Sequence, residues 1–353
     1  MERVSDTLIQ GTSTETSYDT GAISDVSLRS AFSSETTVQL QQLLEREVAA
    51  LEDNLIHQLH STYAAVNRVS ESATALQGKR LRPRLVLLGA LACGGITPCT
   101  RRIAAVVEMV HAATLVHDDV LDDADTRRGA PASHVLWGNR NSILLGDVLF
   151  SKAFILAAAM DSCFVADRVG RAGLALCQGE LRQQDTIGNW SLAIDEYVDI
   201  LKQKTGDLCA ASTLLGAWSA GASDNSMQGL ESYGSQLGIA FQIYDDWLDV
   251  WGSAALGKPL GNDVANCKPT LPTLRLLQQT PTDEREDVIA ELDRGVMTDR
   301  LRTLFDRSDA SSFTLDTARR FAETACKALG CLPDSAARQA LICVAQQSVR
   351  RSR

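Results

Sequence analysis

The spacing of proline constrains the fold of this 353-residue chain most strongly. The sequence contains 8 prolines, and none occurs before Pro83 or between Pro131 and Pro259. Proline interrupts an α-helix because it lacks the backbone N–H donor and because its ring clashes with the preceding turn. The long proline-free stretches are rich in Ala and Leu, which favour helix, and they show no convincing strand alternation. We therefore predict an all-α fold, with a single large helical domain over residues 36–353.

An unusually acidic stretch, HDDVLDDADTRRG, runs from His117 to Gly129. Within it, Asp118, Asp119 and Asp122 form a DDxxD motif. Apolar residues upstream recur every three or four positions, which predicts a helix with Asp118 and Asp122 on one face. Like charges one turn apart repel each other, whereas Mg²⁺ with a substrate phosphate would stabilise them. For this motif alone, a solvated acidic helix end is the alternative.

A second DDxxD motif, formed by Asp245, Asp246 and Asp249, lies in the segment FQIYDDWLD. Its acids stand among Trp247 and Leu248, inside another apolar periodic run. A solvated face rarely carries so much apolar surface, and buried carboxylates require a partner. Two such helices facing each other are able to hold a diphosphate through several metal ions.

Basic residues gather in the segment GKRLRPRLVLL, which begins at Gly78. Pro83 is well placed to start a helix there. Basic side chains beside the unpaired N–H groups of a helix N-terminus favour phosphate binding, although a solvated basic loop is the alternative for this segment alone. The segment GSAALGK at 252–258 matches a P-loop, but Pro259 replaces the required Ser or Thr and no strand precedes it, so we exclude nucleotide binding.

Charge and cysteine content limit the partners and the compartment. The formal net charge of −10 argues against a nucleic-acid partner. The 9 cysteines are odd in number and form no CxxC pair, so neither a disulfide framework nor a zinc site is predicted. We expect reduced, mostly buried thiols in a cytoplasmic protein.

Two segments bear on targeting and membranes. Residues 1–35 are rich in Ser and Thr without apolar periodicity, which predicts a disordered tail, and their acidic residues argue against a transit peptide. Residues 141–160 are strongly apolar, but Asp147 and Lys152 interrupt them. They therefore predict a buried core helix and no stable membrane insertion.

Six motifs follow one another along the chain: GKRLRP from Gly78, EMVHAATLVHDDV with DTRRG between Glu108 and Gly129, KTGDL from Lys204, FQIYDDWLD from Phe241, GKPLGNDVANCKPTLP from Gly257 and LPDSAARQAL from Leu332. This set resembles the trans-prenyltransferases, the all-trans polyprenyl diphosphate synthases, from about Val38 to the C-terminus. The resemblance implies helices around a deep central cavity and a homodimer. It also implies Mg²⁺-dependent head-to-tail condensation of isopentenyl diphosphate with an allylic diphosphate (geranyl, farnesyl or geranylgeranyl).

The same resemblance implies roles for individual residues. Two or three Mg²⁺ ions holding the allylic diphosphate would be bound by Asp118, Asp122 and Asp245, with catalytic support from Asp119, Asp246 and Asp249. The allylic diphosphate site would be completed by Arg127, Lys204, Thr205, Gln242, Lys258 and Lys268, of which Lys204 is also assigned to catalysis. Isopentenyl diphosphate would be bound by Lys79, Arg82, His111 and Arg128.

Four positions need separate comment. Without the resemblance, His111 reads as an ordinary core histidine. Cys267 departs from the family, which usually has Gly before the lysine matching Lys268, and Gly tolerates backbone angles that Cys resists. Ala113 and Thr114 are small where bulky aromatic residues stop chain growth early in the family. We therefore predict a product near octaprenyl, with geranylgeranyl diphosphate synthesis as the alternative.

Rival functions are disfavoured by the same motifs. A terpene cyclase or a squalene-type enzyme has no use for the second basic site together with a second full DDxxD. A non-catalytic subunit of a heteromeric prenyl synthase typically loses an acid cluster, whereas this chain keeps both.

Overall fold

The computed structural model of the protein describes residues 35–74, 80–127, 130–160, 162–252 and 260–350. The predicted tail therefore lies almost wholly outside the described residues. The α-helices are α2 (Glu35–Leu59), α3 (Ala64–Thr74), α4 (Leu81–Cys93), α5 (Pro98–Leu121), α6 (Ser133–Trp137), α7 (Asn139–Ala158), α8 (Cys163–Asp185), α9 (Ile194–Leu201), α10 (Asp207–Ser219), α11 (Asp224–Trp251), α12 (Asn262–Ala265), α13 (Leu271–Gln279), α14 (Thr282–Leu292), α15 (Asp299–Arg307), α16 (Ala310–Ala328) and α17 (Ala336–Ser348). A π-helix spans Lys202–Gly206, and a 3₁₀-helix spans Leu329–Cys331.

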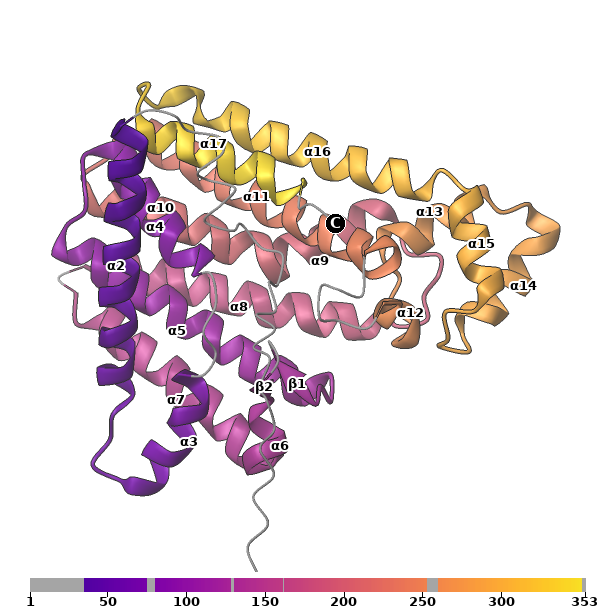
Figure 1. Ribbon diagram of the computed structural model, residues 1–353, viewed down its shortest axis with the longest axis horizontal. Coiled ribbons are helices and arrows are strands. Elements are labelled where there is room, and N and C mark those ends of the chain that lie inside the picture. Colours follow the sequence, from indigo (N-terminus) through magenta and orange to yellow (C-terminus); the bar gives the residue numbers. More distant parts are fainter. Residues whose placement is uncertain (1–34, 75–79, 128–129, 161, 253–259, 351–353) are drawn as a thin grey trace, which may run out of the picture.

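The all-α prediction is confirmed. The strands in the described residues are β1 (Thr126–Arg127) and β2 (Ala130–Pro131), which form one short antiparallel hairpin after α5. In Figure 1, α5, α8, α10 and α11 run side by side, α16 and α17 cover α11, and α2 crosses one end. The two helices that carry the DDxxD motifs thus belong to one bundle.

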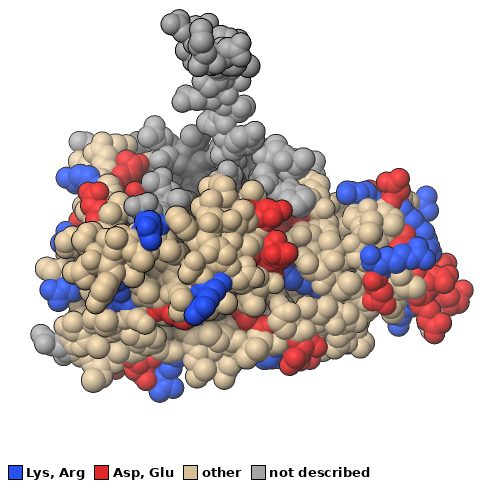
Figure 2. Space-filling view, turned by 90° about the horizontal axis from the view of Figure 1, so that it is seen from below, with Lys and Arg blue, Asp and Glu red and all other residues tan. Residues whose placement is uncertain are grey.

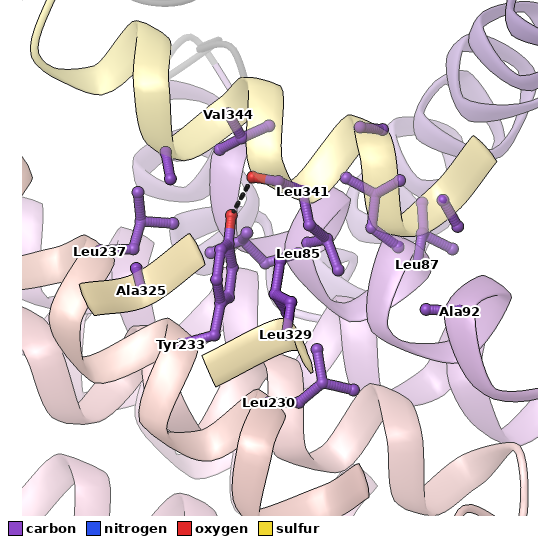
Figure 3. Packing of buried hydrophobic residues seen from close by; sticks show 14 of the residues in the cluster. Leu85, Leu87, Ala92, Leu230, Tyr233, Leu237, Ala325, Leu329, Leu341 and Val344 are labelled. Atoms are coloured by element: carbon purple, nitrogen blue, oxygen red, sulfur yellow. Dashed lines mark hydrogen bonds between the residues drawn. The ribbon is translucent and has the colours of Figure 1, made fainter. Parts of the chain in front are cut away.

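The buried core lies between α4, α11, α16 and α17 (Figure 3). Leu85, Leu237 and Leu341 are almost fully buried there, and the Tyr233 hydroxyl donates a hydrogen bond to the Leu341 carbonyl at 2.7 Å. Burying aliphatic side chains stabilises the fold by roughly 1.5–3 kcal/mol each, as an upper estimate. This cluster fixes the N-terminal half of α11, and a second cluster, which includes Ile243 and Trp247, fixes the half that carries the second acid cluster.

A close backbone approach positions the π-helix against α11. A Cβ added to Gly238 of α11 would lie 2.7 Å from the Cα of Gly206. Any side chain at this position would force the two elements apart, because real Cβ atoms do not approach so closely. The approach carries Lys204 and Thr205 toward the acidic end of α11.

Two sequence predictions need correction. The apolar helix α7 is buried on one face only: Ile143 is 45% exposed, Leu144 52% and Ile155 67%. By length and composition α7 is also the one helix in the described residues that could cross a membrane, with 33% of its apolar window buried. The thiols are all free, but only Cys209 and Cys343 are buried, so the prediction of mostly buried thiols was wrong.

The helical stretch between Ile194 and Ser219 is not uniform. The chain forms α9, the π-helix and then α10, so Lys204 lies in a π-helical turn. Such turns occur frequently at functional sites. The spacing of apolar residues does not distinguish one π-helical turn from the α-helix on either side, so the sequence did not reveal this turn.

Candidate active site

The first acid cluster lies where α5 ends. Asp118 and Asp119 occupy the last turn, and Asp122 is the C-cap residue, whose N–H donates to the Asp118 carbonyl at 2.8 Å. Asp118 is half-buried and Asp122 exposed, whereas Asp119 is only 1% exposed. The three aspartates therefore do not have equivalent surroundings.

Asp119 faces Arg127 of the following hairpin. The Arg127 Nε donates to Asp119 Oδ1 at 2.7 Å, and Nη2 of the same guanidinium also contacts that oxygen. Charge-assisted bonds of this kind are strong and directional. Asp119 thus anchors the hairpin to α5, and Arg127, predicted to bind diphosphate, is held beside the first cluster.

In the second cluster, too, one aspartate is buried and the other two are more exposed. Asp246 is 6% exposed, and it accepts hydrogen bonds from the Tyr197 hydroxyl at 2.5 Å and from Gln242 Nε2 at 3.1 Å. Asp245 and Asp249, on either side, are half-buried. In both DDxxD motifs the second aspartate is therefore the buried one, held by a donor from another element.

Asp249 organises the loop that follows α11. Its two carboxylate oxygens accept from the backbone N–H groups of Asn262 at 3.0 Å and Asp263 at 2.9 Å, at the start of α12. The N–H of Lys268 in turn donates to the Asp263 carbonyl at 2.8 Å. The loop that presents Lys268 is therefore tied to the second cluster.

Two lysines connect the clusters. Lys268 Nζ lies 3.6 Å from Asp122 Oδ1, which joins the loop after α11 to the end of α5. Lys204 lies close enough to Glu180, Asp118 and Asp122 to interact with their charges. Burial alone would lower the pKa of Lys204, but these carboxylates raise it above the ordinary lysine value. On the other side, burial and the carboxylates of the second cluster raise the pKa of Asp263, and the charges of Lys268 and Lys204 oppose this shift. The acid clusters thus face each other around two cations.

Sequence reasoning missed three residues here: Glu180, Tyr197 and Asp263. Glu180 of α8 pairs with Lys204 at 2.7 Å between Oε1 and Nζ, and Gln183 accepts from the same Nζ at 3.4 Å. Asp263 sits in the quoted GNDVANCK motif, which was the available signal. Glu180 and Tyr197 lie on separate helices, and nothing in the local pattern distinguished them.

Two aspartates of the site, one in each cluster, have raised pKa values. Burial, with the carboxylates of Glu180 and Asp122, raises the pKa of Asp118 to about 7 despite the opposing effect of Lys204. Burial also raises the pKa of Asp246 to about 7, against the hydrogen bonds from Tyr197 and Gln242. Carboxylates under such strain fit a hard divalent cation.

No three acidic, His or Cys side chains among the described residues converge closely enough to bind an ion by themselves. Mg²⁺ usually takes one or two carboxylates from the protein and completes its octahedron with water and substrate phosphate. The residues present therefore fit Mg²⁺ bound together with a diphosphate. The carboxylates that the sequence predicts as ligands of the metal ions are Asp118, Asp122 and Asp245.

A separate basic pair lies between α4 and α5. Arg82 Nη1 is 3.0 Å from His111 Nε2, and because arginine is always a donor, this histidine nitrogen accepts. The neighbouring Arg80 turns inward instead, donating to Glu108 Oε1 at 2.6 Å and to Glu52 Oε1 at 3.3 Å. Of the basic segment, Arg82 is thus brought to His111 as predicted.

The other predicted site residues divide into three groups. The Thr205 hydroxyl donates to Gln242 Oε1 at 3.3 Å, so these two are brought together. Thr114 lies on the face of α5 that carries His111 and Asp118, whereas Ala113 packs in a cluster with Leu145 and Leu149 of α7. Three predicted residues lie outside the described residues: Lys79, Arg128 and Lys258.

Cys267 has a backbone conformation that glycine adopts more easily, as expected at a position where the family usually has Gly. Its φ is +50°, in the left-handed region that favours glycine. The following residue is Lys268, so this strained position directs the chain toward the first cluster. The side chain is half-buried, with Sγ 3.8 Å from the Leu292 carbonyl.

Comparison with known proteins gives consistent matches. The family model "Polyprenyl synthetase" matches residues 64–304. A short chain isoprenyl diphosphate synthase of Methanothermobacter thermautotrophicus is 36% identical over 79% of this chain and 88% of its own length. The octaprenyl diphosphate synthase of Escherichia coli is 30% identical over 89% of this chain and 99% of its own. A crystal structure of a Caulobacter crescentus polyprenyl synthase, complexed with calcium and isoprenyl diphosphate, has 35% identity and a TM-score of 0.82, covering 88% of this chain and 97% of that one.

The raised pKa of Asp118 predicts how stability depends on pH without metal. A carboxyl whose pKa rises on folding, here from 3.8 to about 7, binds its proton more tightly in the folded state. The metal-free protein should therefore lose stability as pH rises from 4 through 7, by roughly 2–4 kcal/mol from this group. Urea unfolding in chelator across this range measures it. Asp118→Asn should flatten the profile; an equally steep decline in that variant would contradict the assignment.

The left-handed backbone at Cys267 predicts an unusual order of stabilities. Cys267→Gly and Cys267→Ala both lose the sulfur, but only glycine relieves the backbone strain. The glycine variant should therefore be more stable than the alanine variant by about 1 kcal/mol, the reverse of the order inside a helix. The midpoints of urea unfolding compare the two directly, and a more stable alanine variant would show that the residue does not hold this conformation.

Proposed function

The chain belongs to the polyprenyl synthetase family, whose members are prenyltransferases, and we propose that it condenses isopentenyl diphosphate with an allylic diphosphate head to tail to make a long-chain all-trans polyprenyl diphosphate. The observation that carries this proposal is the Lys268–Asp122 contact at 3.6 Å, which joins the two acid clusters across one site. The Arg82–His111 pair supplies a second, separate basic site. Two such sites suit two diphosphate substrates.

The ligands assigned to Mg²⁺ are Asp118, Asp122 and Asp245, which would hold two or three ions with the allylic diphosphate. When bound, Mg²⁺ would supply positive charge opposite the leaving diphosphate. Support comes from the strained carboxylates around Asp118 and from the Caulobacter crescentus structure, which holds calcium with isoprenyl diphosphate.

The residues of the chain contribute to the reaction in distinct ways. Lys204 and Lys268 place ammonium groups between the clusters, where negative charge develops as the allylic carbon–oxygen bond breaks. Arg82 and His111 hold isopentenyl diphosphate so that its double bond attacks the allylic carbon. The described site shows no evident general base, so we assign the final proton to the departing diphosphate. The reaction requires that water be kept from the cationic carbon.

Product length is the finer part of the proposal. Thr114 lies one turn before Asp118 on the same helical face, and both Thr114 and Ala113 are small. The octaprenyl relative supports a product near octaprenyl, whereas the short-chain relative keeps geranylgeranyl diphosphate as the alternative. A non-catalytic subunit is disfavoured because both acid clusters are present and are brought together.

We also propose that the protein is a homodimer in the cytoplasm. Exposed apolar side chains gather on α6, α7 and α8: Val135, Leu136, Ile143, Leu144, Phe154, Ile155, Leu174 and Leu181. The Phe154 ring lies 3.7 Å from the position of a Cβ on Gly170, so the surface continues from α7 onto α8. In Figure 2, seen from the side of α6, charged side chains are densest at the α14–α15 end, and tan surface separates those over the rest of this face. Such a large apolar surface suits a second copy of the chain. The free thiols suit a reducing compartment.

A charge placed on this surface should dissociate the dimer. Ile155→Glu would bury a carboxylate in the interface, and Val296→Glu, at a similarly exposed position beyond α14, is the matched control. Sedimentation velocity should give a monomer for Ile155→Glu and a dimer for the wild type and Val296→Glu. A wild-type monomer would refute the dimer, and a dimeric Ile155→Glu would refute this interface.

The product ladder tests the reaction and its length. Purified protein given isopentenyl diphosphate, farnesyl diphosphate and Mg²⁺ should yield products extending well beyond geranylgeranyl diphosphate, measured by mass spectrometry. Thr114→Phe should shorten the main product, because its ring would project into the path of the growing chain. Unchanged length in Thr114→Phe would refute this account of the cavity, and no condensation by the wild type would refute the proposed function.

A further inference from the structure

The second acid cluster is held by a tyrosine from a different helix. Tyr197 of α9 is 4% exposed, and its hydroxyl donates to Asp246 Oδ2 at 2.5 Å. Asp246 is itself 6% exposed, so water does not compete for this bond. A hydrogen bond to a buried carboxylate contributes more than a bond between neutral groups.

The bond continues as a chain of three hydrogen bonds. Asp246 Oδ1 accepts from Gln242 Nε2 at 3.1 Å, and Gln242 Oε1 accepts from the Thr205 hydroxyl at 3.3 Å. A carboxylate accepts only, so the Gln242 amide must turn its nitrogen toward Asp246 and its oxygen toward Thr205. The chain therefore runs from α9 through α11 to the π-helix, one residue from Lys204.

We propose that Tyr197 is a positioning residue for the allylic diphosphate site, a role that rests on the proposed function. By fixing Asp246, it orients the Gln242 amide and, through Thr205, sets the distance between the second acid cluster and Lys204. Because both Asp246 oxygens accept hydrogen bonds from protein donors, Asp246 orients its neighbours.

Tyr233 offers a matched control on the same helix bundle. It is also fully buried, and its hydroxyl donates to the Leu341 carbonyl at 2.7 Å within the hydrophobic core (Figure 3). Tyr197→Phe and Tyr233→Phe therefore remove the same group from equally buried settings. Only the first change breaks a chain that reaches the acid clusters.

The two variants separate positioning from packing. Tyr197→Phe should raise the KM for the allylic diphosphate and the half-saturating Mg²⁺ concentration by about tenfold, while the KM for isopentenyl diphosphate changes less than about twofold. Tyr233→Phe should leave all three values near wild type and alter only the thermal midpoint. Equal changes in both variants, or equal changes in the two KM values of Tyr197→Phe, would overturn the proposal.

A binding measurement tests the positioning role of Tyr197 independently of whether the protein catalyses the proposed reaction. Calorimetric titration of inorganic pyrophosphate into protein with Mg²⁺ requires no turnover. If the wild type fails to condense substrates, the proposed function fails, but weaker Mg²⁺-dependent pyrophosphate binding by Tyr197→Phe than by Tyr233→Phe would still support the positioning role. Equal binding by the two variants would contradict it.

Discussion

Repulsion between aspartates at the ends of α5 and α11 is the constraint on which the rest of the structure depends. Carboxylates this close, and partly buried, are unfavourable unless cations stand between them. In the described residues Lys204 and Lys268 take that place, while burial and the carboxylate of Glu180 still raise the pKa of Asp118. The fold keeps this charge because the core around Tyr233 and the close approach of Gly238 to Gly206 hold the helices in position. The remaining imbalance is what a metal-bound diphosphate would satisfy.

Each DDxxD motif divides its aspartates between two tasks. The second aspartate of each, Asp119 or Asp246, is buried and held by Arg127 or Tyr197 from another element. These carboxylates tie α5 and α11 to neighbouring elements, as Asp249 does through the backbone of Asn262 and Asp263, and Asp118, Asp122 and Asp245 are the ones proposed to bind metal. The aspartates of a DDxxD motif look equivalent in the sequence, but part of each motif has a structural role. Preorganised charge of this kind stabilises a developing anion without rearrangement during the reaction.

Much of this could be predicted from the sequence, because it depends on local patterns. Proline spacing gave the helices, and the ordered motifs gave both acid clusters and the Arg82–His111 pair. Cys267 was noticed because the family usually has glycine at this position. Its φ of +50° lies in the left-handed region that favours glycine. Glu180 and Tyr197 could not be found, because contacts between distant helices leave no mark on local spacing. The exposed face of α7 was misjudged for a related reason: an apolar helix surface looks the same in sequence whether or not the rest of the chain covers it.

The most direct test of the central claim is to locate the metal ions. Crystals grown with Mn²⁺ and inorganic pyrophosphate would reveal them by anomalous scattering, since Mn²⁺ takes the same oxygen ligands as Mg²⁺. The account predicts ions bound by Asp118 and Asp122 and a further ion bound by Asp245, all contacting one diphosphate. Ions confined to one cluster, or a diphosphate bound away from both, would contradict it.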